Sequence, residues 1–401
     1  MNSTIFKLWL MISFVSFYTI TMKAEEQMPV IAYMGVPNDK STDDNFKTFA
    51  DCGFNVSLYG YASLSQLVNA CNIAQKYHVR ILGHCPETHH SPEKAAAVLK
   101  NNKGFFGYVI KDEPKAHEIK VLQTEIIRLQ SIDNSHCFYM NLYPCYAEWE
   151  TSGTKTTTYP EYLQIATSTL CQQISFDFYP ITTAGIRPTW YYNLEMIRNE
   201  SLASGKPFWG FALSVPHDVP YTPNTYYPVP TLASLRLQIY VNLAYGAQAI
   251  QYFTYWNPRG EEGFNYHDAP ISREGKKTNT YYLVQQMNRE LKTVSKLFYG
   301  AKVTSVKHMK IIPQGCAKQN TIPVNLSSLK IVSSKGAIIS QFEKNGHTYL
   351  AVVNKNHWDE MTLLIKAKNN IPKHITKSLS EESMKTSYQI PAGDVILFKL
   401  K

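Results

Sequence analysis

Residues 105–114 read Phe105-Phe106-Gly107-Tyr108-Val109-Ile110-Lys111-Asp112-Glu113-Pro114. The apolar run over 105–110 predicts a buried strand, and Pro114 cannot continue that strand because proline donates no hydrogen bond to a sheet. Asp112 and Glu113 are therefore expected where the strand ends. A hydrophobic core cannot stabilise either carboxylate, whereas a rigid strand can aim both side chains into a shared cleft.

On both sides of this stretch, strand-like and helix-like segments alternate. The expected strands cover residues 29–37, 55–62, 79–85, 105–110, 136–143, 173–179, 207–215 and 249–256. Eight strand–helix pairs over about 275 residues predict a (β/α)8 barrel, in which 105–110 is the fourth strand. The alternative is a doubly wound open sheet, but no Gly-x-Gly-x-x-Gly follows the first strand, which favours the barrel.

The barrel is expected over residues 29–300, and the pattern changes beyond it. Short alternating strands at 337–342, 347–353, 361–365 and 395–400 predict a small all-β, sandwich-like domain over 301–401. Residues 1–24 fit a secretory signal peptide, because Lys7 precedes an apolar run over 8–22 that is short for a membrane span. The chain is thus expected to be secreted, periplasmic or on the cell surface, without stable membrane insertion once the signal is removed. An uncleaved anchor is the alternative, since Met22 stands where signal peptidase prefers a small residue.

The composition of the chain limits the classes of molecule that it is expected to bind. The formal charge is +9, but the basic residues are dispersed, which indicates a solvated surface and not a nucleic-acid site; an acidic glycan or a membrane surface stays as a weaker alternative. Seven cysteines without a Cys-x-x-Cys pair predict neither a zinc framework nor a disulfide scaffold. The aromatic content is 13%, with 27 tyrosines, and it favours a carbohydrate partner, because sugar rings stack on aromatic planes and bond to tyrosine hydroxyls.

The carboxyl ends of barrel strands usually form the site, so their polar and aromatic residues are the candidate wall. The expected substrate-binding residues are Tyr59, His84, Asn141, Tyr143, Tyr179, Tyr252 and Trp256. Two of these, Tyr252 and Trp256, have a simpler alternative as core aromatics that pack against helices. His84, His89 and His90, with Glu87, match no strong metal motif, and neither a metal nor a cofactor is expected.

The chemistry indicated by the fourth strand is glycoside cleavage, which needs a protonated carboxyl and a second group that stabilises the oxocarbenium-like centre. Asp112 and Glu113 can share a pocket only if the strand has ended or bulged, because adjacent strand residues face opposite ways. Close carboxylates raise one pKa, which suits a general acid, and Glu113 is assigned that role. In the alternative, Asp112 caps the next helix and Glu113 is a solvated rim residue.

The strand-four Glu-Pro and the stretch from Leu235 through Ala244-Tyr245-Gly246-Ala247 to Trp256 resemble the retaining glycoside hydrolase clan that includes β-galactosidases and cellulases. The resemblance covers roughly residues 29–300. It implies that Glu113 is the acid/base and that a strand-seven Glu is the nucleophile. This chain departs from that pattern, since residues 208–214 read Phe-Trp-Gly-Phe-Ala-Leu-Ser and contain no acid.

The Asp-Glu-Pro segment is also similar to N-acetylhexosaminidase-type families, in which the substrate's own 2-acetamido oxygen attacks. That resemblance implies that Asp112 orients the acetamido group, that Glu113 is the acid, and that Tyr179 could bond the acetamido oxygen. A further route is inversion, with Asp177 activating water from across the barrel mouth. The sequence therefore predicts an exported glycoside hydrolase acting on an oligo- or polysaccharide; the alternative is a non-catalytic glycan-binding protein on a degenerate barrel.

Overall fold

The structure, a computed structural model, describes residues 27–147, 157–218, 224–260, 264–368 and 371–401. The signal peptide expected at 1–24 lies outside the described residues. Among the helices of the described ranges, none combines the length and the apolar character that a membrane crossing requires.

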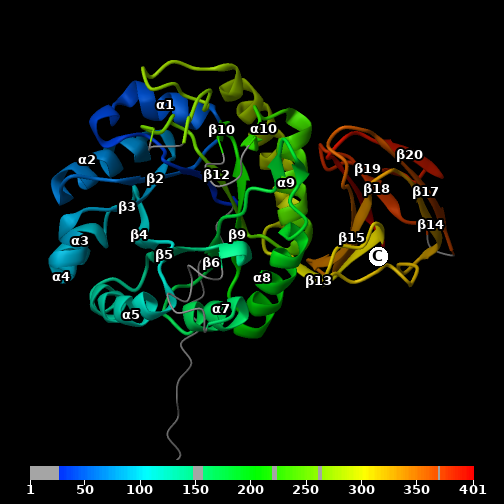
Figure 1. The fold of residues 1–401 in the computed structure, drawn as a ribbon, viewed down its shortest axis with the longest axis horizontal. Helices are drawn as coiled ribbons and strands as arrows, with labels where there is room; N and C mark the ends of the chain where they lie inside the picture. Colours follow the sequence, from blue (N-terminus) through cyan, green and yellow to red (C-terminus); the bar gives the residue numbers. More distant parts are fainter. Residues whose placement is uncertain (1–26, 148–156, 219–223, 261–263, 369–370) are drawn as a thin grey trace, which may run out of the picture.

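Parallel strands form a closed barrel in the order β1-β12-β9-β6-β5-β4-β3-β2, and Figure 1 shows the helices around them. The barrel strands are β1 (Val30–Tyr33), β2 (Val56–Gly60), β3 (Arg80–His84), β4 (Phe105–Asp112), β5 (Cys137–Leu142), β6 (Ile174–Phe176), β9 (Phe208–Leu213) and β12 (Ala249–Phe253). The surrounding helices are α1 (Asp43–Asp51), α2 (Leu64–Ala74), α3 (Pro86–His90), α4 (Pro92–Leu99), α5 (Ala116–Gln130), α7 (Tyr159–Thr167), α8 (Trp190–Ser204), α9 (Leu232–Tyr245) and α10 (Asn279–Phe298). The predicted (β/α)8 barrel is confirmed, with Asp112 and Glu113 at the end of its fourth strand.

Local sequence accounts for several helix boundaries. The side chains of Thr42, Ser63 and Thr231 each accept a hydrogen bond from a backbone N–H in the first turn of the following helix. At the other end of α9, Gly246 has φ 111°, a left-handed conformation that favours glycine. The helices thus begin and end where capping chemistry satisfies their terminal backbone groups.

Three barrel strands are clearly shorter than the sequence indicates, and the first of them, expected over 29–37, ends at Tyr33. The strand expected over 173–179 ends at Phe176, and the strand expected over 249–256 ends at Phe253. The residues that follow leave the barrel ladder and enter loops at its mouth. Two short antiparallel pairs of strands lie in the loops of the mouth: β7 (Ile181–Thr182) with β8 (Gly185–Ile186) after β6, and β10 (His217–Asp218) with β11 (Tyr226–Tyr227) after β9.

The C-terminal part is an all-β domain of two antiparallel sheets, as predicted. The six-stranded sheet has the order β13-β15-β16-β21-β18-β19, and the three-stranded sheet has the order β14-β17-β20. Their strands are β13 (Lys302–Lys310), β14 (Leu326–Val332), β15 (Gly336–Lys344), β16 (His347–Asn354), β17 (Met361–Ala367), β18 (Lys373–Ile375), β19 (Glu381–Ser383), β20 (Ser387–Ile390) and β21 (Val395–Lys399). One apolar core joins both sheets, with Ile339 and Leu350 from the larger and Ile331 and Leu363 from the smaller. This shared core is typical of a sandwich.

Helix α9 lies between the barrel and the C-terminal domain, and β13, β15 and β16 contact it. Its residues from Ser234 to Tyr245 are almost all buried, which is expected of a helix with neighbours on every side. Ser340 of β15 donates a hydrogen bond of 2.7 Å to the carbonyl of Ala244, and Phe298 of α10 stacks on Phe342 of β15 at 4.8 Å. The two parts therefore share a packed interface.

Candidate active site

A bulge in β4 decides which way Asp112 faces. Val109 pairs with Tyr139 of β5, but the next pair is Lys111 with Met140, so Ile110 is an extra residue. Val109 belongs to the apolar cluster inside the barrel. Without the bulge, strict alternation would turn Lys111 inward; with it, Asp112 takes the inward position beside Asn141. The expectation that the strand must end or bulge at the acid pair is confirmed.

Glu113 follows directly and has φ 45°, a left-handed conformation that is uncommon for a residue with a side chain. Its N–H donates to the carbonyl of Asn141 at 2.8 Å, which anchors the backbone where the strand stops. The carbonyl of Pro114 accepts a hydrogen bond of 2.8 Å from the hydroxyl of Tyr162. The change of backbone conformation after Asp112 removes the constraint that would send neighbouring side chains to opposite faces.

Two donors hold the Asp112 carboxylate. The hydroxyl of Tyr33 donates to Oδ2 at 2.6 Å, and Nδ2 of Asn141 donates to Oδ1 at 3.1 Å. The residue keeps an exposed part at the mouth, yet burial of its carboxylate raises its pKa, and these two hydrogen bonds oppose the rise. The alternative in which Asp112 caps the next helix is wrong, because Lys115 is the N-cap residue of α5.

A polar layer inside the barrel fixes the amide of Asn141. Its Oδ1 accepts from the hydroxyl of Ser175 at 3.0 Å, and that hydroxyl accepts from Nε2 of Gln251 at 2.8 Å. Tyr139 donates to Oε1 of Gln251 at 2.9 Å. With its oxygen engaged by Ser175, Asn141 presents its NH2 group to Asp112. The predicted residue Asn141 thus supports the carboxylate from a buried position.

Asp177 stands just beyond β6, which β5 separates from β4, and its carboxyl interacts electrostatically with Asp112. Burial, and next the negative charge of Asp112, raise the pKa of Asp177 to about 7. Its Oδ1 is buried and has no hydrogen-bond partner among the described residues, which suits a protonated carboxyl better than an ionised one. Because the two negative charges oppose each other, Asp177 keeps its proton to a higher pH than an ordinary aspartate.

The end of strand seven, β9, is apolar. Trp209 belongs to the cluster inside the barrel, and Leu213 packs with Val215 and Tyr227. The ring of Phe211 lies 6.0 Å from the ring of Tyr33. The place where a strand-seven nucleophile would project is therefore filled by hydrophobic side chains, in agreement with the sequence.

Aromatic rings line the β6–β9–β12 side of the mouth. Tyr179 lies at the centre, 5.3 Å from the ring of Phe253 and 5.9 Å from that of Tyr227. The guanidinium of Arg187 lies 5.2 Å from the ring of Tyr146 and 5.6 Å from that of Tyr227, and its Nη2 donates to the Tyr227 hydroxyl at 3.1 Å. This wall combines stacking surfaces with a cation, and the sequence did not single out Arg187.

Next to this wall, at the ends of β12, β1 and β2, the mouth holds a cavity of about 350 Å³. Its lining residues are Met34, Pro37, Asp39, Lys40, Tyr59, Trp256, Asn257, Pro258, Arg259 and Arg273. Two predicted substrate-binding residues, Tyr59 and Trp256, are among them. The size falls within the range of small-molecule sites.

The remaining predicted residues differ in their surroundings. His84 ends β3 and requires Gly60 beside it, because a Cβ on Gly60 would lie 2.8 Å from its Nε2. Burial lowers the pKa of His84, and neighbouring His89 lowers it further. His89 pairs with Glu125 at 2.8 Å. Tyr143 follows β5, and its carbonyl accepts from the hydroxyl of Tyr159 at 2.9 Å.

The placement of Tyr252 at the mouth is wrong. Its side chain is fully buried between the barrel and the helices, and its hydroxyl donates to Oδ1 of Asn288 on α10 at 2.8 Å. On β12 the inward positions belong to Ala249, Gln251 and Phe253, so Tyr252 points outward. Tyr252 therefore belongs to the packing core.

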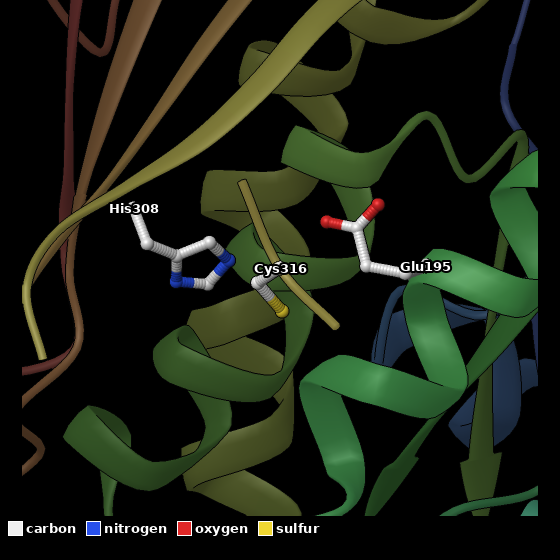
Figure 2. A group of neighbouring side chains, drawn as sticks. All are labelled: Glu195, His308 and Cys316. Atoms are coloured by element: carbon white, nitrogen blue, oxygen red, sulfur yellow. The ribbon is translucent and has the colours of Figure 1, made fainter. Parts of the chain in front are cut away.

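One group of potential metal ligands lies away from the mouth, at the junction with the C-terminal domain (Figure 2). The ligand atoms of Glu195, His308 and Cys316 lie within 4.8 Å of one another. The hydroxyl of Tyr245 is 2.8 Å from Nε2 of His308, 3.1 Å from Oε1 of Glu195 and 3.8 Å from Sγ of Cys316. Tyr245 thus contacts all three side chains.

The hydrogen bonds of this group form a directed chain. The Lys355 ammonium lies 3.4 Å from Nδ1 of His308 and can only donate, so Nδ1 accepts and Nε2 carries the ring proton. Nε2–H then donates to Tyr245, whose hydroxyl donates to Glu195. Burial, and then the charge of Lys355, lower the pKa of His308 to about 3, which keeps the ring neutral. In this arrangement Nε2 has no lone pair for a metal, and we interpret the group as an interdomain hydrogen-bond network.

Part of the chain is similar in sequence to a known protein family. Residues 139–294 match the model of the Glyco_hydro_42 family, described as β-galactosidase. The matched part runs from β5 into α10, so it includes Asp177 but not Asp112 or Glu113. No curated protein sequence matches the chain.

Solved structures share the fold at low sequence identity. A β-galactosidase from Bacillus circulans sp. alkalophilus is 10% identical, with a TM-score of 0.63 over 94% of this chain and 99% of that chain. Gan42B, a GH42 β-galactosidase from G. stearothermophilus, is 8% identical, with a TM-score of 0.64 over 94% of this chain and 98% of that chain. The alignment with a β-galactosidase from the psychrophilic Marinomonas ef1, 9% identical with a TM-score of 0.51, covers 67% of this chain and 60% of that chain. These likenesses identify the fold of the chain as a β-galactosidase-like (β/α)8 barrel, and residues 139–294 are similar to the Glyco_hydro_42 family.

Proposed function

We propose that the protein is an exported glycoside hydrolase that cleaves an oligo- or polysaccharide, with Glu113 as general acid and Asp112 assisting. The observation that carries this proposal is the β4 bulge, which turns Asp112 into the barrel mouth immediately before Glu113. The apolar end of β9 supports a reaction without a strand-seven nucleophile. A leader-like N-terminus supports export.

The surroundings of each carboxyl group determine its role in the reaction. Glu113 protonates the leaving oxygen, while Asp112 and Asp177 together carry a net negative charge near neutral pH. That charge stabilises the positive charge that develops at the anomeric carbon in the transition state. Tyr33 and Asn141 keep Asp112 in position, so little reorganisation is needed during the reaction.

Two routes use this arrangement. In a substrate-assisted reaction, the fixed carboxylate of Asp112 accepts a hydrogen bond from the N–H of a 2-acetamido group, whose oxygen attacks the anomeric carbon. In an inverting reaction, Asp177, with a pKa near the working pH, removes a proton from the attacking water. The first route retains the anomeric configuration and requires the acetamido group; the second inverts the configuration without that requirement.

Product analysis on matched glycans tests the proposal. The full chain is incubated with β-galactoside oligosaccharides and with their 2-acetamido counterparts, and the first-formed anomer is followed by NMR. β-Galactosides are the first substrates to test, because the matching family and structures are β-galactosidases. Product release by the wild type that Glu113→Gln abolishes supports a hydrolase, and the anomer identifies the route.

The controls separate catalysis from folding and from binding. Asp112→Asn is compared with Asp51→Asn, which changes an exposed carboxylate paired with Lys47 on α1. We expect the first variant to lose turnover and the second to keep it. Calorimetric binding without product after long incubation would instead support the glycan-binding alternative.

A further inference from the structure

We propose that the cavity above β12, β1 and β2 is a subsite for an anionic sugar, one that carries a carboxylate or a sulfate. The inference rests on the proposed function and extends it to a substrate class. Among the described residues, the lining holds three cations, Lys40, Arg259 and Arg273, against one carboxylate, Asp39. This imbalance favours a ligand of negative charge.

The single carboxylate of the lining is already paired. Asp39 lies 3.4 Å from the ammonium of Lys40, its neighbour in the chain. Within the described ranges, the ion pairs include neither Arg259 nor Arg273. Arg273 also feels the charge of exposed Glu274, its neighbour in the chain, but no described carboxylate forms an ion pair with either guanidinium. Guanidinium forks match the geometry of carboxylates and sulfates.

Hydrogen bonds hold the side chain of Arg273 in place. Nε of Arg273 donates to the carbonyl of Pro258 at 3.0 Å, and its Nη2 donates to the carbonyl of Tyr266 at 3.4 Å. The N–H of Asn257 donates to the carbonyl of Ile271 at 2.8 Å. These bonds hold Arg273 beside Pro258, the residue that precedes exposed Arg259. The positive charge of Arg273 therefore has a fixed position in the lining of the cavity.

Aromatic side chains supply the surface on which a sugar ring stacks. Tyr59 and Trp256 both line the cavity. Gly275 approaches the Trp256 ring closely; a Cβ there would lie 3.4 Å from it, and its φ of +83° disfavours other residues. Burial is the largest cause that raises the pKa of the Tyr59 hydroxyl. The charge of Asp39 raises this pKa too, and the charge of Arg259 lowers it, so both charged residues act on the aromatic side chain.

The cavity and the acid pair both adjoin the end of β1. Met34 lines the cavity, and the preceding residue, Tyr33, bonds to Asp112 at 2.6 Å. The N–H of Trp256 donates to the carbonyl of Met34 at 3.0 Å, which joins the aromatic wall to the same strand end. A glycan cleaved beside Glu113 can thus place a neighbouring, charged sugar in the cavity.

The test compares matched ligands and matched variants. The probes are a neutral galacto-oligosaccharide, its 6-carboxylate (uronic acid) counterpart and its 6-sulfate counterpart, with affinities measured by calorimetry on the full chain. Arg259→Gln removes an exposed guanidinium at the cavity, and Arg289→Gln removes an exposed guanidinium on α10 as control. Measurements at low salt and at about 0.5 M salt report the electrostatic part, since salt screens exposed charges.

We expect at least one anionic probe to bind about tenfold more tightly than the neutral one at low salt, and the preference to shrink at high salt. Arg259→Gln should remove most of this preference and leave the neutral probe unchanged, whereas Arg289→Gln should change neither. The tighter of the two anionic probes identifies the group.

Equal affinity for neutral and anionic probes, or equal effects of the two substitutions, would overturn the inference. Cleavage of neutral glycans without anion preference would refute the subsite and leave the proposed hydrolase intact. Anion-selective binding that Arg259→Gln removes, with no cleavage of any probe, would support the subsite and refute the proposed hydrolase.

Discussion

Tyr33, on the first barrel strand, donates a hydrogen bond of 2.6 Å to Oδ2 of Asp112, on the fourth strand. The bond crosses the barrel mouth and, with the bond from Asn141, leaves both oxygens of the carboxylate engaged. Burial keeps the pKa of the Tyr33 hydroxyl well above its usual value, so the tyrosine stays a donor at all working pH values. Tyr33 is therefore a positioning residue for Asp112.

Substitution of Tyr33 by Phe should move the acidic limb of the pH profile. The hydrogen bond from Tyr33 lowers the pKa of Asp112, so its loss raises that pKa, and ionisation of the pair then requires higher pH. We expect the acidic limb of kcat/KM to shift upward and the rate at pH 5 to fall by about tenfold. Tyr252→Phe is the control, because Tyr252 bonds to Asn288 away from the mouth. An unchanged acidic limb in Tyr33→Phe would exclude this role.

Replacement of Asp177 by Asn should stabilise the fold at neutral pH. The folded-state pKa of Asp177, about 7, lies above that of the unfolded chain, so the folded protein binds the extra proton and loses stability as pH rises between about 4 and 7. The variant removes this penalty. We expect its free energy of unfolding to exceed that of the wild type by on the order of 1 kcal/mol at pH 8 and to show little advantage at pH 4. Denaturant titrations at the two pH values check this, and an advantage independent of pH would contradict it.

Substitution of Tyr245 by Phe should weaken the contact between the two domains. The hydroxyl connects His308 of β13 to Glu195 of α8, and its loss leaves buried His308 and half-buried Glu195 without that partner. We expect a cost of about 1 to 3 kcal/mol in the free energy of unfolding. Tyr282→Phe, at an exposed tyrosine of α10, should cost close to nothing.

A chelator measurement tests the interpretation of the same group. Because Nε2 of His308 donates to Tyr245, a chelator should leave the unfolding temperature of the purified protein unchanged. A chelator-induced fall that zinc reverses would show that the three ligands hold a metal.

The alternation of strand-like and helix-like segments was sufficient to predict the barrel and the position of Asp112 and Glu113 on its fourth strand. The bulge could be anticipated as a requirement, since Pro114 follows the acid pair, but not located at Ile110. Strand length was harder to predict, because Phe178 and Tyr179 continue an alternation typical of a strand and yet lie in the loop after Phe176.

The direction of individual side chains explains the errors at the site. Tyr252 was placed at the mouth although alternation along β12 turns it toward the helices. Tyr33 was missed because the first strand was expected to extend to Pro37, beyond its end at Tyr33. Arg187 and the group of Glu195, His308 and Cys316 depend on contacts between segments distant in sequence, and a pattern of spacing carries no signal for them.

The leaving-group dependence of Glu113→Gln tests the central claim most directly. The measurement compares kcat/KM of the wild type and the variant on two aryl glycosides of one sugar, with a poor and a good leaving group. If Glu113 donates the proton, the variant should lose about 10²- to 10⁴-fold on the poor leaving group and far less on the good one, which departs without protonation. Equal losses on both substrates, or no loss on either, would contradict the assignment of Glu113 as the general acid.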